Sequence, residues 1–133
     1  MALPKENRLK SRHDFRAVFR LGTRCHGSLL TLRALKPLAT SEDNVIPLQS
    51  VQIGITISTK VSKRAVVRNR LKRRIAAALY QLLPKLSPGW RLVVIVQPTA
   101  GQLECVTKQF LQELEQLLAQ AEVLNGHSGR SLL

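Results

Sequence analysis

The feature that most constrains the fold is a strand, a long amphipathic helix and a second strand in direct succession. Residues 51–58 read VQIGITIS, where valine and isoleucine alternate with small or polar residues, a pattern typical of a strand with one buried face. Apolar side chains then recur every three or four positions through residues 64–83, which predicts a helix that ends before Pro84. Residues 91–96, RLVVIV, are nearly continuous in apolar side chains and predict a buried strand.

Three further elements are predicted around this unit. Ser11 begins an S-x-x-D pattern, typical of a helix N-cap, and a short helix is expected over residues 12–21. Gly22 suits the end of that helix. Residues 29–35 have the apolar density of a strand, and residues 103–117 carry the apolar stripe of a third helix.

These elements predict an α/β fold, a two-layer α/β sandwich with one mixed sheet. The apolar faces of the second and third helices should cover the sheet, leaving the small polar face of strand 51–58 open. We expect one domain over residues 1–124, of which residues 1–10 form a flexible basic arm. Residues 125–133 are expected to be a disordered C-terminal tail.

The charge of the chain is concentrated in one part of the sequence. The formal net charge is +13, and residues 1–74 hold 17 Lys and Arg against 4 acids, whereas residues 75–133 hold 4 of each. This asymmetry indicates a polyanionic partner, most simply a nucleic acid. No apolar run is long enough to span a membrane, and the N-terminus lacks the apolar stretch of a secretory signal. A cytoplasmic protein without a membrane partner is therefore expected.

The strongest basic feature is the segment 60–74, KVSKRAVVRNRLKRR, with eight Lys and Arg and no acid. On a helix, Asn69, Arg70 and Arg73 lie away from the apolar stripe, so these side chains are available to a partner. Clustered like charges repel one another, and a phosphate lattice would relieve that repulsion. A solvated helix face is the structural alternative, but such faces usually mix both signs of charge. A targeting tract is a further alternative, which the embedded apolar stripe argues against.

Two aromatic residues stand one turn apart on the first predicted helix. Phe15 and Phe19 lie among arginines, and an aromatic face beside cations suits single-stranded RNA, whose bases stack on the rings. Packing into the core is an equally good interpretation of the pattern, so both remain open.

The sequence carries no motif for catalysis by the protein itself. A metal-dependent nuclease needs clustered carboxylates, and the four acids of residues 1–74 form no pair at helical spacing. Cys25, Cys105 and the three histidines are scattered, so they do not predict a metal site. A self-sufficient nuclease is thereby disfavoured. A helix-turn-helix DNA-binding protein is also disfavoured, because a strand precedes the basic helix, and no DNA partner is expected. A small basic ribosomal-type RNA-binding protein remains the alternative from composition alone.

Four segments together resemble the bacterial ribonuclease P protein family. RAVVRNRLKRR is similar to its arginine-asparagine-arginine helix, and IGITISTKVSKRAVVRNR to its strand and crossover. RLKSRHDFRAVFRLGTR resembles the opening of the family, and RLVVIVQPTA its last strand. The resemblance covers residues 7–122 in the same order.

The resemblance implies an activity and a division of labour. The family assists the endonucleolytic removal of the 5′ leader from precursor tRNA, with catalysis by an RNA subunit that binds most of the required Mg²⁺. No catalytic residue, metal ligand or tightly bound cofactor is implied for the protein. Its implied partners are ribonuclease P RNA and precursor tRNA. The implied fold includes a left-handed β-α-β crossover.

The resemblance also implies two groups of site residues. The leader-binding group combines the first helix with the open sheet face: Phe15, Arg16, Phe19, Arg33, Thr56 and Ser58. The group that contacts the catalytic RNA follows the basic segment: Lys60, Lys63, Arg64, Arg68, Asn69, Arg70, Lys72 and Arg73. Some family members have an aromatic residue near the position of Arg33, so this chain departs from the pattern there.

Overall fold

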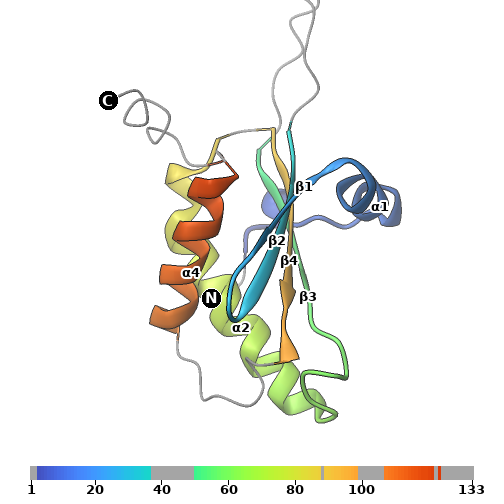
Figure 1. The fold of residues 1–133 in the computed structure, drawn as a ribbon, viewed down its shortest axis with the longest axis vertical. Helices are drawn as coiled ribbons and strands as arrows, with labels where there is room; N and C mark the ends of the chain where they lie inside the picture. Colours follow the sequence, from blue (N-terminus) through green and yellow to red (C-terminus); the bar gives the residue numbers. More distant parts are fainter. Residues whose placement is uncertain (1–2, 37–49, 88, 99–106, 122, 124–133) are drawn as a thin grey trace, which may run out of the picture.

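The computed structural model describes residues 3–36, 50–87, 89–98, 107–121 and 123. Within them a four-stranded sheet is formed by β1 (Thr23–His26), β2 (Leu30–Leu35), β3 (Gln52–Thr56) and β4 (Arg91–Val96). The helices are α1 (Arg12–Leu21), α2 (Ala65–Leu82) and α4 (Thr107–Gln120), with short 3-10 turns η1 (Lys5–Asn7) and η2 (Leu83–Lys85). Figure 1 shows these elements.

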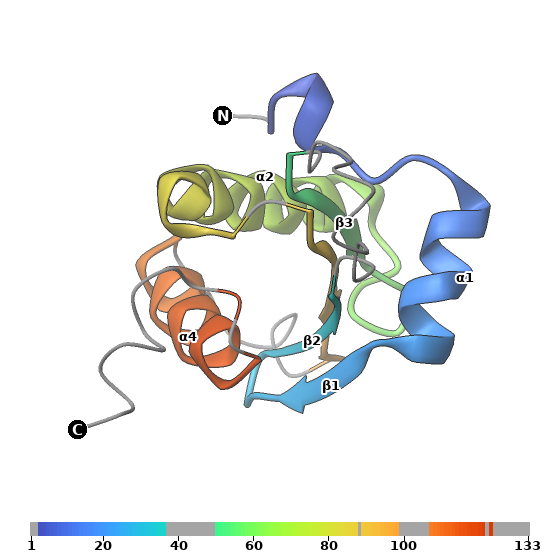
Figure 2. The same cartoon turned by 90° about the horizontal axis from the view of Figure 1, so that it is seen from above.

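The sheet is mixed, as the sequence predicts. Its strand order is β1-β2-β4-β3, in which β2 is antiparallel to both β1 and β4, whereas β3 and β4 are parallel. Helix α2 connects these two parallel neighbours. Figure 2 shows α2 and α4 on one face of the sheet and α1 on the other. The α/β sandwich is therefore confirmed, and the left-handed sense of the β3-α2-β4 crossover stays a prediction.

The main core lies between the sheet and the pair α2 and α4. Alternate residues of each strand point into it, for example Leu32 on β2 and Leu92 and Val94 on β4. Ile75 of α2 and Phe110 of α4 are fully buried against them. The predicted stripes of these two helices thus cover the sheet, although the expected stripe members Leu103 and Val106 lie outside the described residues.

A second, smaller cluster fixes α1 to the opposite face of the sheet. Val18 of α1 and Val93 of β4 are completely buried, and Phe15 packs beside them. Asp14 forms an ion pair with Arg91 of β4, with 3.1 Å between Oδ1 and Nη1. Ser11 caps the helix as expected, since its hydroxyl accepts a hydrogen bond from the backbone N–H of His13.

The arm predicted for residues 1–10 is not free over the part that the structure describes. Leu3, Asn7 and Leu9 are buried. The N–H of Leu9 donates to the carbonyl of Ile53 over 3.0 Å, and the Asn7 amide donates to the carbonyl of Val51 over 2.8 Å. Residues 3–9 therefore pack along the outer edge of β3, where the sequence predicts a flexible arm. The predicted tail, residues 125–133, lies outside the described residues.

Strand β1 was not predicted, because its four residues, TRCH, are mostly polar. A buried carboxylate holds the loop that follows it. Glu113 of α4 accepts hydrogen bonds from the hydroxyl and the N–H of Ser28, and from the N–H groups of Leu29 and Leu30. These four bonds, 2.5–3.1 Å long, tie the β1–β2 hairpin to α4.

Among the described residues, no helix is long and apolar enough to cross a membrane.

Candidate RNA interface

The Phe15 ring lies on the face of β3 that the sequence predicts to be open. Gly54 sits directly beneath it, since a Cβ built on Gly54 would lie 2.6 Å from the ring Cε1. Phe15 is half-buried, so the ring combines packing against Leu9 and Val93 with exposure to solvent. Phe15 thus packs partly as a core residue, and its function as a stacking platform stays a prediction.

Phe19, one turn further along α1, is more exposed and contacts an arginine. Its side chain is 38% exposed, and the Arg33 guanidinium carbon lies 5.2 Å from the ring centroid. That distance is within the range of a cation–π contact. Arg33 also donates from Nη2 to the carbonyl of Phe19. Arg33 thus occupies one side of the ring.

The remaining predicted leader contacts border the same face. Arg16 is exposed on α1, and Thr56, at the end of β3, is half-buried. Ser58 is exposed and takes part in a turn, where its hydroxyl accepts a hydrogen bond from the N–H of Lys60 over 3.2 Å. Its hydroxyl proton remains available to a partner.

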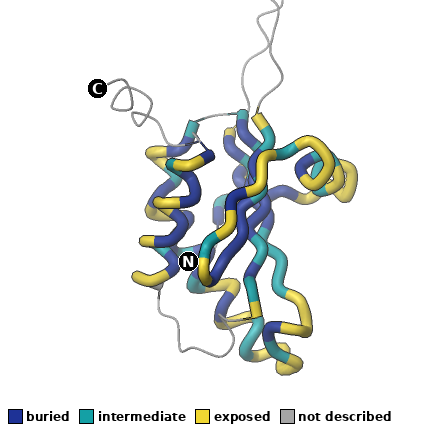
Figure 3. The backbone as a smooth tube through the Cα atoms, viewed as in Figure 1, coloured by how far each residue is buried: buried dark blue, intermediate teal, exposed yellow. Residues whose placement is uncertain are grey.

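The predicted contacts to the catalytic RNA form a second surface at the start of α2. Figure 3 shows the first turns of α2 and the preceding turn as largely exposed. The first turn contains no acid, so nothing there offsets the cations. The exposed members of the predicted group are Lys60, Lys63, Arg64, Asn69, Arg70, Lys72 and Arg73.

Arg68, the remaining member of the predicted group, is half-buried and supports the local backbone. Its Nη1 donates to the carbonyl of Ser62 over 2.9 Å, in a partly buried hydrogen bond. Arg68 therefore holds the turn before α2 in place. A guanidinium has five N–H donors, so Arg68 can combine this structural role with RNA contact.

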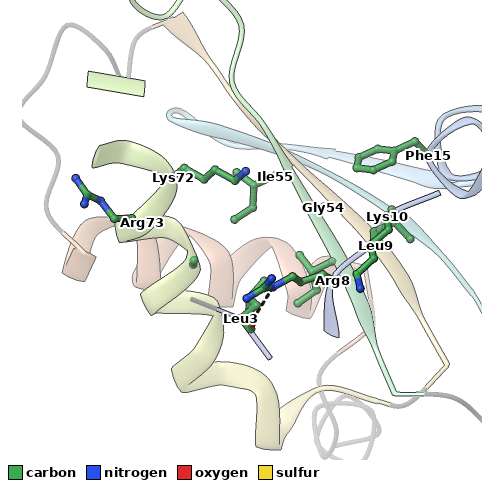
Figure 4. A pocket seen from close by; sticks show the side chains of 11 residues that line it. Leu3, Arg8, Leu9, Lys10, Phe15, Gly54, Ile55, Lys72 and Arg73 are labelled. Carbon is green, nitrogen blue, oxygen red and sulfur yellow. Dashed lines mark hydrogen bonds between the residues drawn. The ribbon is translucent and has the colours of Figure 1, made fainter. Parts of the chain in front are cut away.

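A groove of about 540 Å³ connects the two surfaces. Figure 4 shows Phe15, Leu9 and Gly54 toward one end and Lys72 and Arg73 on α2 toward the other, with Ile55 between them. Lys10 also lines the groove, as does Arg8, whose Nε donates to the carbonyl of Leu3. An adjoining hollow of about 340 Å³ on α2 shares Lys72 and Arg73.

Lys10 and Arg8 were not predicted to line this groove, because residues 1–10 were expected to form a flexible arm. The function of Gly54 in making room for a ring was not predicted either. Leu9, set between Arg8 and Lys10, and Leu3 six residues before it were the available signal for a segment that covers a sheet edge.

The acids of the described residues do not suit a magnesium site. Asp14 is paired with Arg91, and the Glu113 carboxylate already accepts four hydrogen bonds. No three His, Cys, Asp or Glu side chains gather closely enough to hold a metal ion in the described part of the chain. Mg²⁺ has a strong preference for several oxygen ligands, which these residues do not supply together.

Known proteins resemble this chain along most of its length. The family model described as Ribonuclease P matches residues 3–122. The ribonuclease P protein component of Nostoc punctiforme is 63% identical over 140 residues, covering 96% of this chain and 100% of the relative. That of Synechocystis is 42% identical over 134 residues and covers 100% of both.

Solved structures show the same fold at lower identity. The ribonuclease P protein of Staphylococcus aureus has a TM-score of 0.72 and 23% identity, covering 91% of this chain and 100% of that one. The Thermotoga maritima protein has a TM-score of 0.69 and 21% identity, covering 84% and 94%. The family match and the sequence relatives carry the assignment further: the chain belongs to the ribonuclease P protein family, whose members are components of the ribonucleoprotein that cleaves tRNA precursors.

Proposed function

We propose that this protein holds the 5′ leader of precursor tRNA on the α1 side of its sheet, and docks the start of α2 on the ribonuclease P RNA. The observation that carries this proposal is the groove between the two surfaces. Phe15 lines one end of it and Lys72 and Arg73 the other, so one hollow adjoins both an aromatic platform and a cationic helix.

The leader side suits single-stranded RNA through two kinds of contact. Phe15 and Phe19 offer ring surface on which bases stack with about 1–3 kcal/mol each. Arg16 and Arg33 supply charge for phosphates, and Thr56 and Ser58 offer hydroxyl groups. Such contacts are lost when the leader is removed, which would favour the precursor over mature tRNA.

The helix side suits a folded RNA. Its cations project from a rigid helix whose opposite face is anchored in the core by Leu71 and Ile75, so their spacing is fixed. Arg70 is exposed, and arginine binds phosphate through paired hydrogen bonds.

Cleavage is proposed to take place on the RNA subunit, with Mg²⁺ held mainly by that RNA. The protein contributes binding and orientation, in keeping with the lack of a suitable carboxylate cluster among the described residues. The chain would then be part of an endoribonuclease without being catalytic alone. We expect it to act in the cytoplasm, where bacterial precursor tRNA is made.

The leader assignment is tested by replacing Phe19 in the reconstituted holoenzyme. Phe19→Ala should weaken binding of precursor tRNA about tenfold and leave mature tRNA unchanged, since one stacking contact is lost. Leu21→Ala is the matched control, because Leu21 lies on the same helix and is 74% exposed. Equal losses for both RNAs with Phe19→Ala would refute the assignment.

A further inference from the structure

Arg24 of β1 and Arg33 of β2 stand directly opposite each other in the sheet. Their neighbours Cys25 and Leu32 are buried in the main core, and side chains alternate along a strand. Both arginines therefore point to the other face, where Arg33 meets Phe19 of α1. Side chains directly opposite in an antiparallel pair have Cβ atoms about 5 Å apart.

This pairing is unfavourable in the protein alone. Like charges directly opposite one another destabilise a sheet. Asp14, the acid on the helix that covers this face, is paired with Arg91 of β4 instead. The Nε of Arg33 is buried and lacks a hydrogen-bond partner within the described chain. Arg24 is exposed and is accessible to a ligand.

We propose that Arg24, with Arg33 beside it, binds a phosphodiester group of the leader, on the far side of Phe19 from the groove. This inference rests on the proposed function, because it extends the same RNA path. A phosphate would neutralise the opposed charges, and arginine is suited to bind it through paired hydrogen bonds.

The strand order gives the path its direction. Phe15 lies over β3, Phe19 meets Arg33 on β2, and Arg24 is on β1 at the opposite edge of the sheet. Crossing from β3 to β1 covers roughly 14 Å, three strand spacings. Because α2 adjoins the β3 side through the groove, Arg24 contacts leader nucleotides further from the catalytic RNA than those at Phe15.

The test uses the holoenzyme and precursors whose leaders differ only in length. Arg24→Ala should weaken binding of long-leader precursors about three- to tenfold, as expected for one exposed charged contact. It should leave binding of the shortest leaders unchanged, because they do not reach β1. Lys108→Ala is the matched control, since Lys108 is exposed on α4, on the opposite face of the sheet. Arg24→Lys should restore part of the affinity.

The outcomes separate this inference from the proposed function. If Phe19→Ala weakens precursor binding and Arg24→Ala has no effect at any leader length, the phosphate site is refuted and the leader surface stands. If neither variant has an effect, the leader surface itself is refuted. A loss with Arg24→Ala that is independent of leader length, or that appears with the catalytic RNA alone, would also overturn the phosphate site.

Discussion

Phe15 and Gly54 form a matched pair, in which the ring occupies the space where any other residue at position 54 would have its Cβ. A Cβ at that position would lie 2.6 Å from Cε1 of the ring and closer still to Cζ. The glycine is thus required by close approach, because nothing larger fits beneath the ring in this position.

Gly54→Ala should therefore displace the Phe15 ring and weaken binding of precursor tRNA severalfold, with little change for mature tRNA. Overpacking usually costs about 1–3 kcal/mol, and a half-buried ring can swing outward to relieve part of it. Binding assays with both RNAs would measure the effect. In a Phe15→Leu background the substitution should be milder, because a smaller side chain tolerates the added methyl group. Full additivity of the two changes would contradict the steric explanation.

Glu113→Gln should destabilise the fold without altering RNA affinity. The carboxylate accepts four hydrogen bonds from the β1–β2 loop, and the residue is 8% exposed. An amide would turn its own N–H groups toward these donors, at a cost of roughly 2–3 kcal/mol. Urea unfolding would measure the loss. Glu115→Gln, an exposed position on the same helix, is the control and should change stability by less than about 0.5 kcal/mol.

Arg70 and Arg68 should respond differently to alanine. Arg70 is exposed, so Arg70→Ala should lower affinity for ribonuclease P RNA about tenfold with an unchanged melting temperature. Arg68→Ala should lower both, because Arg68 also bonds to the carbonyl of Ser62. Affinity measurements across salt concentrations should show a shallower slope for Arg70→Ala, by about 0.7–0.9 per lost phosphate contact. Normal binding by Arg70→Ala would exclude this face of α2 from the interface.

Cys25 should react slowly with iodoacetamide in the folded protein. It is buried on β1, and burial raises the pKa of its thiol above the ordinary value. The folded state therefore favours the protonated thiol. The stability of the fold that depends on this protonated thiol is present at low pH and is lost as pH rises through the raised pKa. Alkylation in a Cys105→Ser background would isolate the signal, with the urea-unfolded protein as the reference. Equal rates for folded and unfolded protein would show that Cys25 is accessible.

The sequence predicts elements well where local signals suffice. Helix α1 begins after Ser11 and strand β4 spans residues 91–96, as expected, because a cap and a continuous apolar run define them. Strand β1 could not be predicted, because its polar residues form a strand only through pairing with β2. The loop between these two strands is fixed by hydrogen bonds to Glu113, which is distant in the sequence.

The candidate site follows the same rule. The basic face of α2 is predictable from helical spacing, because its stripe and its cations share one element. The position of the Phe15 ring depends on Gly54, and the side of Phe19 that Arg33 covers depends on the packing of α1 against β2. These relationships join segments that no local pattern connects. The packing of residues 3–9 on β3 was missed for the same reason.

The central claim is tested most directly by reconstitution with a bacterial ribonuclease P RNA at low Mg²⁺ concentration. The measurement is the rate of 5′ leader removal from precursor tRNA, with protein alone, RNA alone and both together. The account predicts cleavage that requires the RNA and is strongly increased by the protein. Cleavage by rigorously RNA-free protein, or a rate with RNA that the protein leaves unchanged, would contradict it.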